Sequence, residues 1–140
     1  GGNPVSCAAA LATLSVFSEP GVYQNLHESG KFLRDGMRRL LEKHEISGQI
    51  LGDGPLAQIA FSKEPVVDHR SWKRSDRAMG RRMMLELLEE KVFLNPMGTK
   101  LYFSILHTRE DLQEFLNRLD VVLGKLHHPV ERELVNSNGF

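Results

Sequence analysis

The sequence has very little cysteine and no net charge. Cys7 is the single cysteine in 140 residues, so no disulfide can form within the chain. The 18 basic and 18 acidic residues give a formal net charge of +0, and this balance offers no reason to expect nucleic acid or an anionic membrane as a partner. We expect a reducing, cytoplasmic location, and we expect Cys7 to pack as a small buried hydrophobe.

Long apolar runs are also missing. The longest fall far short of the roughly 20 residues that a membrane-spanning helix needs, and the first residues lack the pattern of a signal peptide. Hydrophobic residues make up 41% of the chain and charged residues 26%, which is usual for a globular protein. We therefore expect a chain that folds around one ordinary core, with no membrane partner.

The motifs of several common chemistries are absent. The sequence contains no phosphate-binding loop, no zinc-ligand spacing and no nucleophile elbow, and we predict no metal site. His107 is interpreted as an exposed turn residue, and His127 and His128 as part of a solvated tail. The basic segment 73–82 is interpreted as a solvated helix face. Three methionines at helical spacing are interpreted as core residues: Met79, Met83 and Met84.

The lysines offer no catalytic centre. A lysine that forms a Schiff base must be desolvated to be nucleophilic at neutral pH, and it usually follows a buried apolar strand. None of the lysines has that setting: Lys31, Lys43, Lys63, Lys73, Lys91, Lys100 and Lys125. We predict that this chain carries no catalytic residue.

Hydrophobic spacing predicts four helices. They cover Val5–Phe17 with Asn3 and Pro4 at the start, Val22–His44, a segment from Ser71 or Ser75 to Glu90, and a segment from a Thr108–Asp111 capping box to about Gly124. The first helix is apolar almost all round, so it is expected to be covered on several sides.

Short apolar or alternating segments between these helices predict four strands: Ile50–Leu51, Leu56–Phe61, 91–96 and 99–106. The order of the elements has no strict alternation of strand and helix. This order indicates an α+β fold with a short-stranded antiparallel or mixed sheet covered by helices.

Three segments, taken in order, resemble one family. They are "GGNPVSCAAALATL", "LRDGMRRLLEKHEISGQILGDGPLAQIAF" and "LLEEKVFLNP…LYFSILHTREDLQEFLNRLDVVL". The first is similar to a Gly-Asn-Pro turn followed by an Ala-rich helix, and the last to a strand that leads into a His-Thr motif. Together they resemble the class III pyridoxal-phosphate-dependent aminotransferases over about residues 1–126, and within them the glutamate-1-semialdehyde aminomutase-like members.

The resemblance implies a C-terminal portion of a fold-type I enzyme that uses pyridoxal 5'-phosphate. Residues 1–19 would be the last helix of the large cofactor-binding domain, 20–126 the small C-terminal domain and 127–140 a tail. The Schiff-base lysine would lie upstream of Gly1, so the fragment alone would be inactive. Family members are usually homodimers, and their substrates are a small amine or amino acid and an oxo acid or aldehyde.

The resemblance also implies two groups of site residues. Gly1, Gly2 and Asn3 would lie near the cofactor phosphate of the partner subunit, at a capped helix start that favours an anion. Many family members hold the substrate carboxylate with an arginine in the late strand, and Tyr102 occupies that position here. Lys100, two residues away, is the nearest cation, so Lys100 and Tyr102 are the expected substrate residues.

Two other hypotheses stay open. In the first, the chain is a stand-alone, non-enzymatic α+β binding or assembly module. In the second, it belongs to a degenerate family member that lacks the catalytic lysine. The first predicts a folded monomer with no exposed apolar surface. The second depends only on residues outside this sequence.

Overall fold

The computed structural model describes residues 2–95 and 99–127. Within them the helices are α1 (Pro4–Phe17), α2 (Val22–Lys43), α3 (His69–Arg74), α4 (Arg77–Glu89) and α5 (Arg109–His127). The strands are β1 (Gln49–Leu51), β2 (Leu56–Ala60) and β3 (Lys100–Tyr102). This arrangement confirms the predicted α+β fold.

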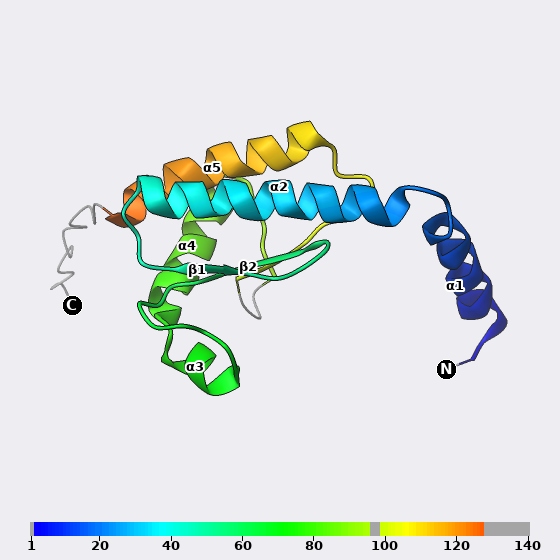
Figure 1. Cartoon of the computed structure of the whole chain (residues 1–140), viewed down its shortest axis with the longest axis horizontal. Helices are drawn as coiled ribbons and strands as arrows, with labels where there is room; N and C mark the ends of the chain where they lie inside the picture. Colours follow the sequence, from blue (N-terminus) through cyan, green and yellow to red (C-terminus); the bar gives the residue numbers. More distant parts are fainter. Residues whose placement is uncertain (1, 96–98, 128–140) are drawn as a thin grey trace, which may run out of the picture.

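The three strands form one antiparallel sheet in the order β1-β2-β3. Its inner face carries Ile50, Ala57 and Ile59, which are buried. Helices α2 and α5 lie side by side over the sheet and run in the same direction, and α4 packs against α5 (Figure 1). The core therefore lies where these helices meet the sheet, and Met37, Leu119 and other apolar side chains predicted from helical spacing are fully buried there.

Helix α1 does not join this core. It lies beyond the N-terminal end of α2 (Figure 1), and the chain bends by 77° between the two helices. None of its residues is buried, and its one ring contact is Phe17 stacked on Tyr23 at 5.4 Å between ring centroids. Cys7 was predicted to be buried, but it is exposed in this structure. The reason is that no residue of α1 is buried.

Two predicted elements have different bounds. The helix expected from Ser71 or Ser75 to Glu90 is two helices, capped by Asp68 and Asp76 instead. Asp68 accepts the Ser71 N–H and Asp76 accepts the Met79 N–H, because a carboxylate caps a helix start at least as well as a hydroxyl. The break at Ser75 is fixed by a hydrogen bond from the Asp76 N–H to the Phe61 carbonyl oxygen.

The strand predicted over 91–96 is wrong for residues 91–95, which form no ladder; Pro96 lies outside the described residues. Lys91 has φ 61°, and its turn ends α4 instead of starting a strand. Of the strand predicted over 99–106, only Lys100–Tyr102 (β3) forms. The strand ends there because a turn follows, in which the Ser104 N–H donates to His107 Nδ1 at 3.0 Å.

The C-terminal helix also differs from its prediction. The Thr108–Asp111 capping box is confirmed by hydrogen bonds in both directions. Helix α5 continues past Gly124 to His127, and Leu126 is buried. The tail predicted from residue 127 thus begins inside the helix, and residues 128–140 lie outside the described part. Within the described residues, no single helix is long and apolar enough to cross a membrane; only the bent α1–α2 pair passes, by length and composition alone.

Candidate functional site

The first predicted site lies at the start of α1. Asn3 is the N-cap: its side-chain oxygen accepts the Ser6 N–H at 2.8 Å, and its carbonyl oxygen accepts the Cys7 N–H at 3.0 Å. Pro4 occupies the first turn, which contains no acidic residue. A Cβ added at Gly2 would meet nothing within 4 Å, so the approach to this helix start is open. Gly1, the third residue predicted here, lies outside the described residues.

The second predicted site is the outer face of β3. Lys100 and Tyr102 are both exposed on that face, while Leu101 between them turns inward. In the register, Tyr102 lies opposite Leu56 and Lys100 opposite Gln58. The predicted pair therefore shares one sheet face, next to an apolar side chain and an amide. Both residues also line a cleft of about 440 Å³.

The two predicted groups are not brought together by the described residues. Helix α1 lies at one extreme of the molecule, and the sheet lies on the other side of the α1–α2 bend (Figure 1). Gly2 and Asn3 therefore do not form a common site with Lys100 and Tyr102 inside one copy of this chain.

Three of the seven lysines form ion pairs in the structure. Lys31 pairs with Asp35 and Lys43 with Asp120, and both ammonium groups are mostly exposed. Lys125 is half-buried, but its Nζ lies 2.9 Å from Glu90 Oε1. That hydrogen bond raises the pKa of Lys125, whereas a Schiff-base lysine needs a lowered pKa.

His107 is exposed and engaged in the turn before α5, as the sequence predicted. Because Nδ1 accepts the Ser104 N–H, the neutral ring carries its proton on Nε2. Next to it, hydrogen bonds from Thr108 lower the pKa of Asp111, so the capping carboxylate stays charged at neutral pH. No group of three or more His, Cys, Asp or Glu residues that can hold a metal is found in the part of the chain that the structure describes.

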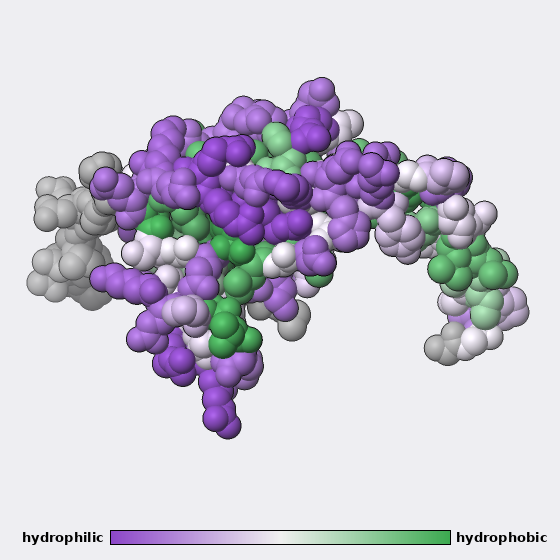
Figure 2. Space-filling model, in the orientation of Figure 1, coloured by the Kyte–Doolittle hydropathy of each residue, from purple (hydrophilic) through white to green (hydrophobic). Residues whose placement is uncertain are grey.

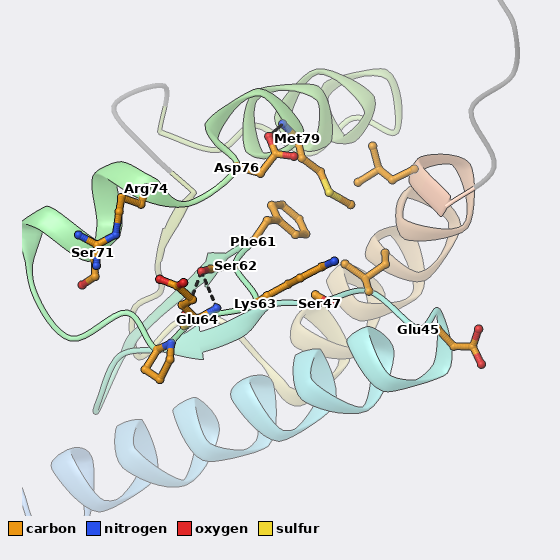
Figure 3. A pocket seen from close by; sticks show the side chains of 13 residues that line it. Glu45, Ser47, Phe61, Ser62, Lys63, Glu64, Ser71, Arg74, Asp76 and Met79 are labelled. Atoms are coloured by element: carbon orange, nitrogen blue, oxygen red, sulfur yellow. Dashed lines mark hydrogen bonds between the residues drawn. The ribbon is translucent and has the colours of Figure 1, made fainter.

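A pocket that sequence reasoning missed lies between the end of α2, the end of β2, α3 and α4 (Figure 3). Its volume is about 620 Å³, with Phe61 and Met79 on its apolar side and Lys63, Glu64 and Arg74 at its rim. Ser62 Oγ donates to the Glu64 carbonyl oxygen at 2.8 Å, so this hydroxyl serves the turn. The lining residues come from segments that are far apart in the sequence, so no local sequence pattern predicts the pocket.

Comparison with known proteins tests the resemblance that the ordered motifs indicated. The family model described as aminotransferase class III matches residues 1–123, and the chain belongs to this family.

Its relatives include aminomutases. The chain is 35% identical over 126 residues to the glutamate-1-semialdehyde 2,1-aminomutase of Symbiobacterium thermophilum, a match that covers 89% of this chain and 29% of that protein. It is 32% identical over 124 residues to the enzyme of the same name from Thermus thermophilus, covering 87% and 29%. The chain thus spans less than a third of the length of these relatives.

Solved structures agree on the fold. A glutamate-1-semialdehyde aminomutase from Pseudomonas aeruginosa matches with a TM-score of 0.77 at 21% identity, and an omega-transaminase from Sphaerobacter thermophilus with 0.76 at 22%. Each match covers 89% of this chain and 28% of the other. Other matching structures are described as a transaminase with PLP bound and an aminomutase in complex with PMP.

The described residues fit only the edge of a site for such a cofactor. The start of α1 offers backbone N–H groups, a favourable helix dipole and an open approach, which suit a phosphate. Helix α1 contains no cationic side chain and no lysine. The described start of α1 therefore offers a phosphate backbone groups and no cationic side chain.

Proposed function

We propose that this chain is the C-terminal part of a pyridoxal-phosphate-dependent class III aminotransferase or aminomutase. The observation that carries the proposal is the family match over residues 1–123, combined with relatives named glutamate-1-semialdehyde 2,1-aminomutase. The reaction would move an amino group between a small amine or amino acid and a carbonyl compound. The cofactor, when bound, supplies the electron sink for that chemistry.

In this proposal the chain's own residues orient and enclose the reactants. Gly2 and Asn3 would present backbone N–H groups to the cofactor phosphate of the neighbouring subunit in a homodimer. Lys100 and Tyr102 would face the substrate from the outer side of β3, where Lys100 acts as a point charge and not as a planar fork. The domain division at residues 19 and 126, and the cytoplasmic location, are part of the same proposal.

The exposed surface of α1 supports a partial chain over a stand-alone module. Val5 is 79% exposed, Leu11 68% and Leu14 59%. Apolar (green) surface gathers over α1, whereas the face over α2 and α5 is largely hydrophilic (Figure 2). A contiguous apolar surface of this kind marks an interaction site. The stand-alone module, which predicts no such surface, is therefore the weaker candidate.

The test uses the full-length protein that contains this chain. We expect a visible absorbance band from bound cofactor, and a change in that band when an amine donor is added. The 140-residue chain alone serves as the control, and we expect it to show neither band nor turnover. A full-length protein that never shows the band would support the degenerate alternative, and turnover by the isolated chain would place a catalytic lysine where the structure shows none.

A further inference from the structure

Arg34 is a buried charged residue on α2. It lies between the apolar core residues Leu33 and Met37 in the sequence of that helix, and it is only 8% exposed. Among the described residues its guanidinium forms no ion pair, and its partners are two carbonyl oxygens. Burial of a charge is costly unless hydrogen bonds compensate it. An apolar side chain would fill this position at lower cost, so the arginine is explained by what its hydrogen bonds hold.

The two carbonyl oxygens belong to the start of β2. Arg34 Nη1 donates to the Gly54 carbonyl oxygen at 2.7 Å and to the Leu56 carbonyl oxygen at 2.9 Å. The ladder between β1 and β2 covers residues 58–60 and leaves out Leu56, so Arg34 supplies a donor where the ladder has none. Hydrogen bonds from a charged donor are stronger than those between neutral groups. The side chain therefore fixes the backbone at the point where β2 begins.

The turn before β2 is shaped to approach α2 closely. A Cβ on Gly30 of α2 would lie 1.8 Å from the Gly54 carbonyl oxygen, so the turn reaches the helix only because position 30 has no side chain. Gly52 and Gly54 have φ values of 119° and 50°, which glycine adopts without the steric cost of a Cβ. The hairpin of β1 and β2 runs along α2 (Figure 1). Three glycines and Arg34 thus serve one contact between the helix and the turn.

The same contact sets the position of Tyr102. Leu56 lies opposite Tyr102 in the register of β2 and β3. Because the Phe103 N–H donates to the Pro55 carbonyl oxygen, the neighbouring pair of Leu56 and Tyr102 is a non-hydrogen-bonded pair, in which side chains approach most closely. Leu56 is 43% exposed and Tyr102 59% exposed, on the outer face of the sheet. A shift of the Leu56 backbone therefore moves the surface beside which Tyr102 lies.

We propose that Arg34 is a positioning residue for the substrate face of β3. It acts from the helix side of the sheet through the Leu56 backbone, and Tyr102 on the opposite face makes the contact with substrate. The inference rests on the proposed function, because it takes Lys100 and Tyr102 as the residues that face the substrate. A structural role alone would stabilise the fold without changing how Tyr102 is presented, so the two roles predict different results.

The first test follows Tyr102 without any reaction. In the full-length protein, fluorotyrosine replaces Tyr102, and its fluorine NMR signal is compared between the parent and Arg34→Met. We expect a changed chemical shift or a broader line in Arg34→Met. Arg34→Lys should restore at least part of the parent signal, because one ammonium group can donate to both carbonyl oxygens.

The matched control removes another bond from an arginine to a carbonyl group. Arg82 Nη2 donates to the Lys125 carbonyl oxygen at 3.2 Å, which joins α4 to α5. We expect Arg82→Met to leave the fluorine signal of position 102 unchanged. Circular dichroism verifies that each variant is folded. If Arg34→Met does not fold, Arg34→Gln, which keeps an amide donor, answers the same question.

The second test uses the full-length protein with bound cofactor and L-alanine as the amine probe. We expect Arg34→Met to keep the cofactor band and to raise KM for L-alanine by about fivefold or more, with a smaller change in kcat, because a misplaced contact weakens substrate binding. Arg82→Met should leave KM within about twofold of the parent value.

An unchanged fluorine signal in folded Arg34→Met or Arg34→Gln overturns the inference, and so does an equal change in Arg82→Met. A changed signal with unchanged KM also overturns it, because Arg34 would then position Tyr102 but not the substrate. A parent protein without a cofactor band removes the proposed function instead. In that case, or if L-alanine does not react, the fluorine comparison alone decides whether Arg34 positions Tyr102.

Discussion

Helix α1 and the body formed by residues 22–127 contain similar apolar side chains in opposite settings. Leu11 on α1 is 68% exposed, whereas Leu119 on α5 is fully buried. In the body, apolar faces of α2, α4 and α5 meet in one core, and among the described residues α1 has no such partner layer. Apolar content therefore does not tell where a core is; a core requires that two apolar faces meet.

The largest difference in unfolding free energy is expected between a leucine truncated in the body and a leucine truncated on α1. In the 140-residue chain, Leu119→Ala should lower the free energy of unfolding by about 2–5 kcal/mol, because it leaves a cavity in the core. Leu11→Ala should change it by no more than about 0.5 kcal/mol, as exposed substitutions do. Urea unfolding followed by circular dichroism measures both.

The same pair sharpens the comparison in the full-length protein. There, if α1 is covered as proposed, Leu11→Ala should also be destabilising. Equal, small effects of Leu11→Ala in both proteins would show that α1 is exposed in the longer protein too.

A glycine in the body should be the next most sensitive position. A Cβ at Gly30 would lie 1.8 Å from the Gly54 carbonyl oxygen, which Arg34 Nη1 holds at 2.7 Å. Gly30→Ala must displace the turn before β2, and we expect a loss of about 1–3 kcal/mol in unfolding free energy.

The control is Gly124→Ala, where the added Cβ would make an ordinary contact of 3.4 Å with His44 Cε1. Alanine favours a helix interior by up to about 1 kcal/mol over glycine, so this variant should be neutral or more stable. A stable Gly30→Ala protein would show that the turn moves away from α2 without cost.

The body was largely predictable from the sequence because its signals are local. Helical spacing placed Met37 and Leu119 in the core, and the Thr108–Asp111 box gave the start of α5. The errors arose where a nearby alternative was stronger. Asp68 and Asp76 capped two helices where serines were expected, and Lys91 closed a turn where a strand was expected.

The candidate site was less predictable because its parts are not local. Sequence reasoning placed Lys100 and Tyr102 on one strand face correctly, since alternation decides that. It did not find the pocket near Phe61, because the residues that line that pocket come from separate segments.

A smaller effect is expected from pH, and only in the body. Two hydrogen bonds lower the pKa of Asp120 below its ordinary value: the larger effect comes from Lys43 and the smaller from His44. A lowered carboxyl pKa stabilises the fold above the unfolded pKa, and that contribution is lost as pH falls through the folded pKa. Asp120→Asn should therefore cost about 1 kcal/mol or less at pH 7, because the ion pair is partly exposed, and the cost should shrink as pH falls through the acidic range.

Helix α1 contains no acidic or basic residue, so its contribution should not vary over the same acidic range. The control in the body is Asp35→Asn, whose partner Lys31 is 75% exposed, and we expect a smaller loss at pH 7. A pH-independent difference between Asp120→Asn and the parent chain would contradict the ion-pair explanation. Thermal unfolding at several pH values measures these differences.

The smallest effect is expected at the C-terminal end of α4, where a substitution should increase the stability of the chain. Lys91 has φ 61°, its N–H donates to the Leu88 carbonyl oxygen at 2.9 Å, and the Val92 N–H donates to that of Leu87 at 2.8 Å. This turn favours glycine at the left-handed position. Lys91→Gly should raise the unfolding free energy by about 0.5 kcal/mol, because relief of left-handed strain exceeds the added entropy of the unfolded chain. Lys91→Ala keeps the strain and should not be stabilising, and equal stabilities of the two variants would show that the lost lysine side chain, not the backbone, sets the difference.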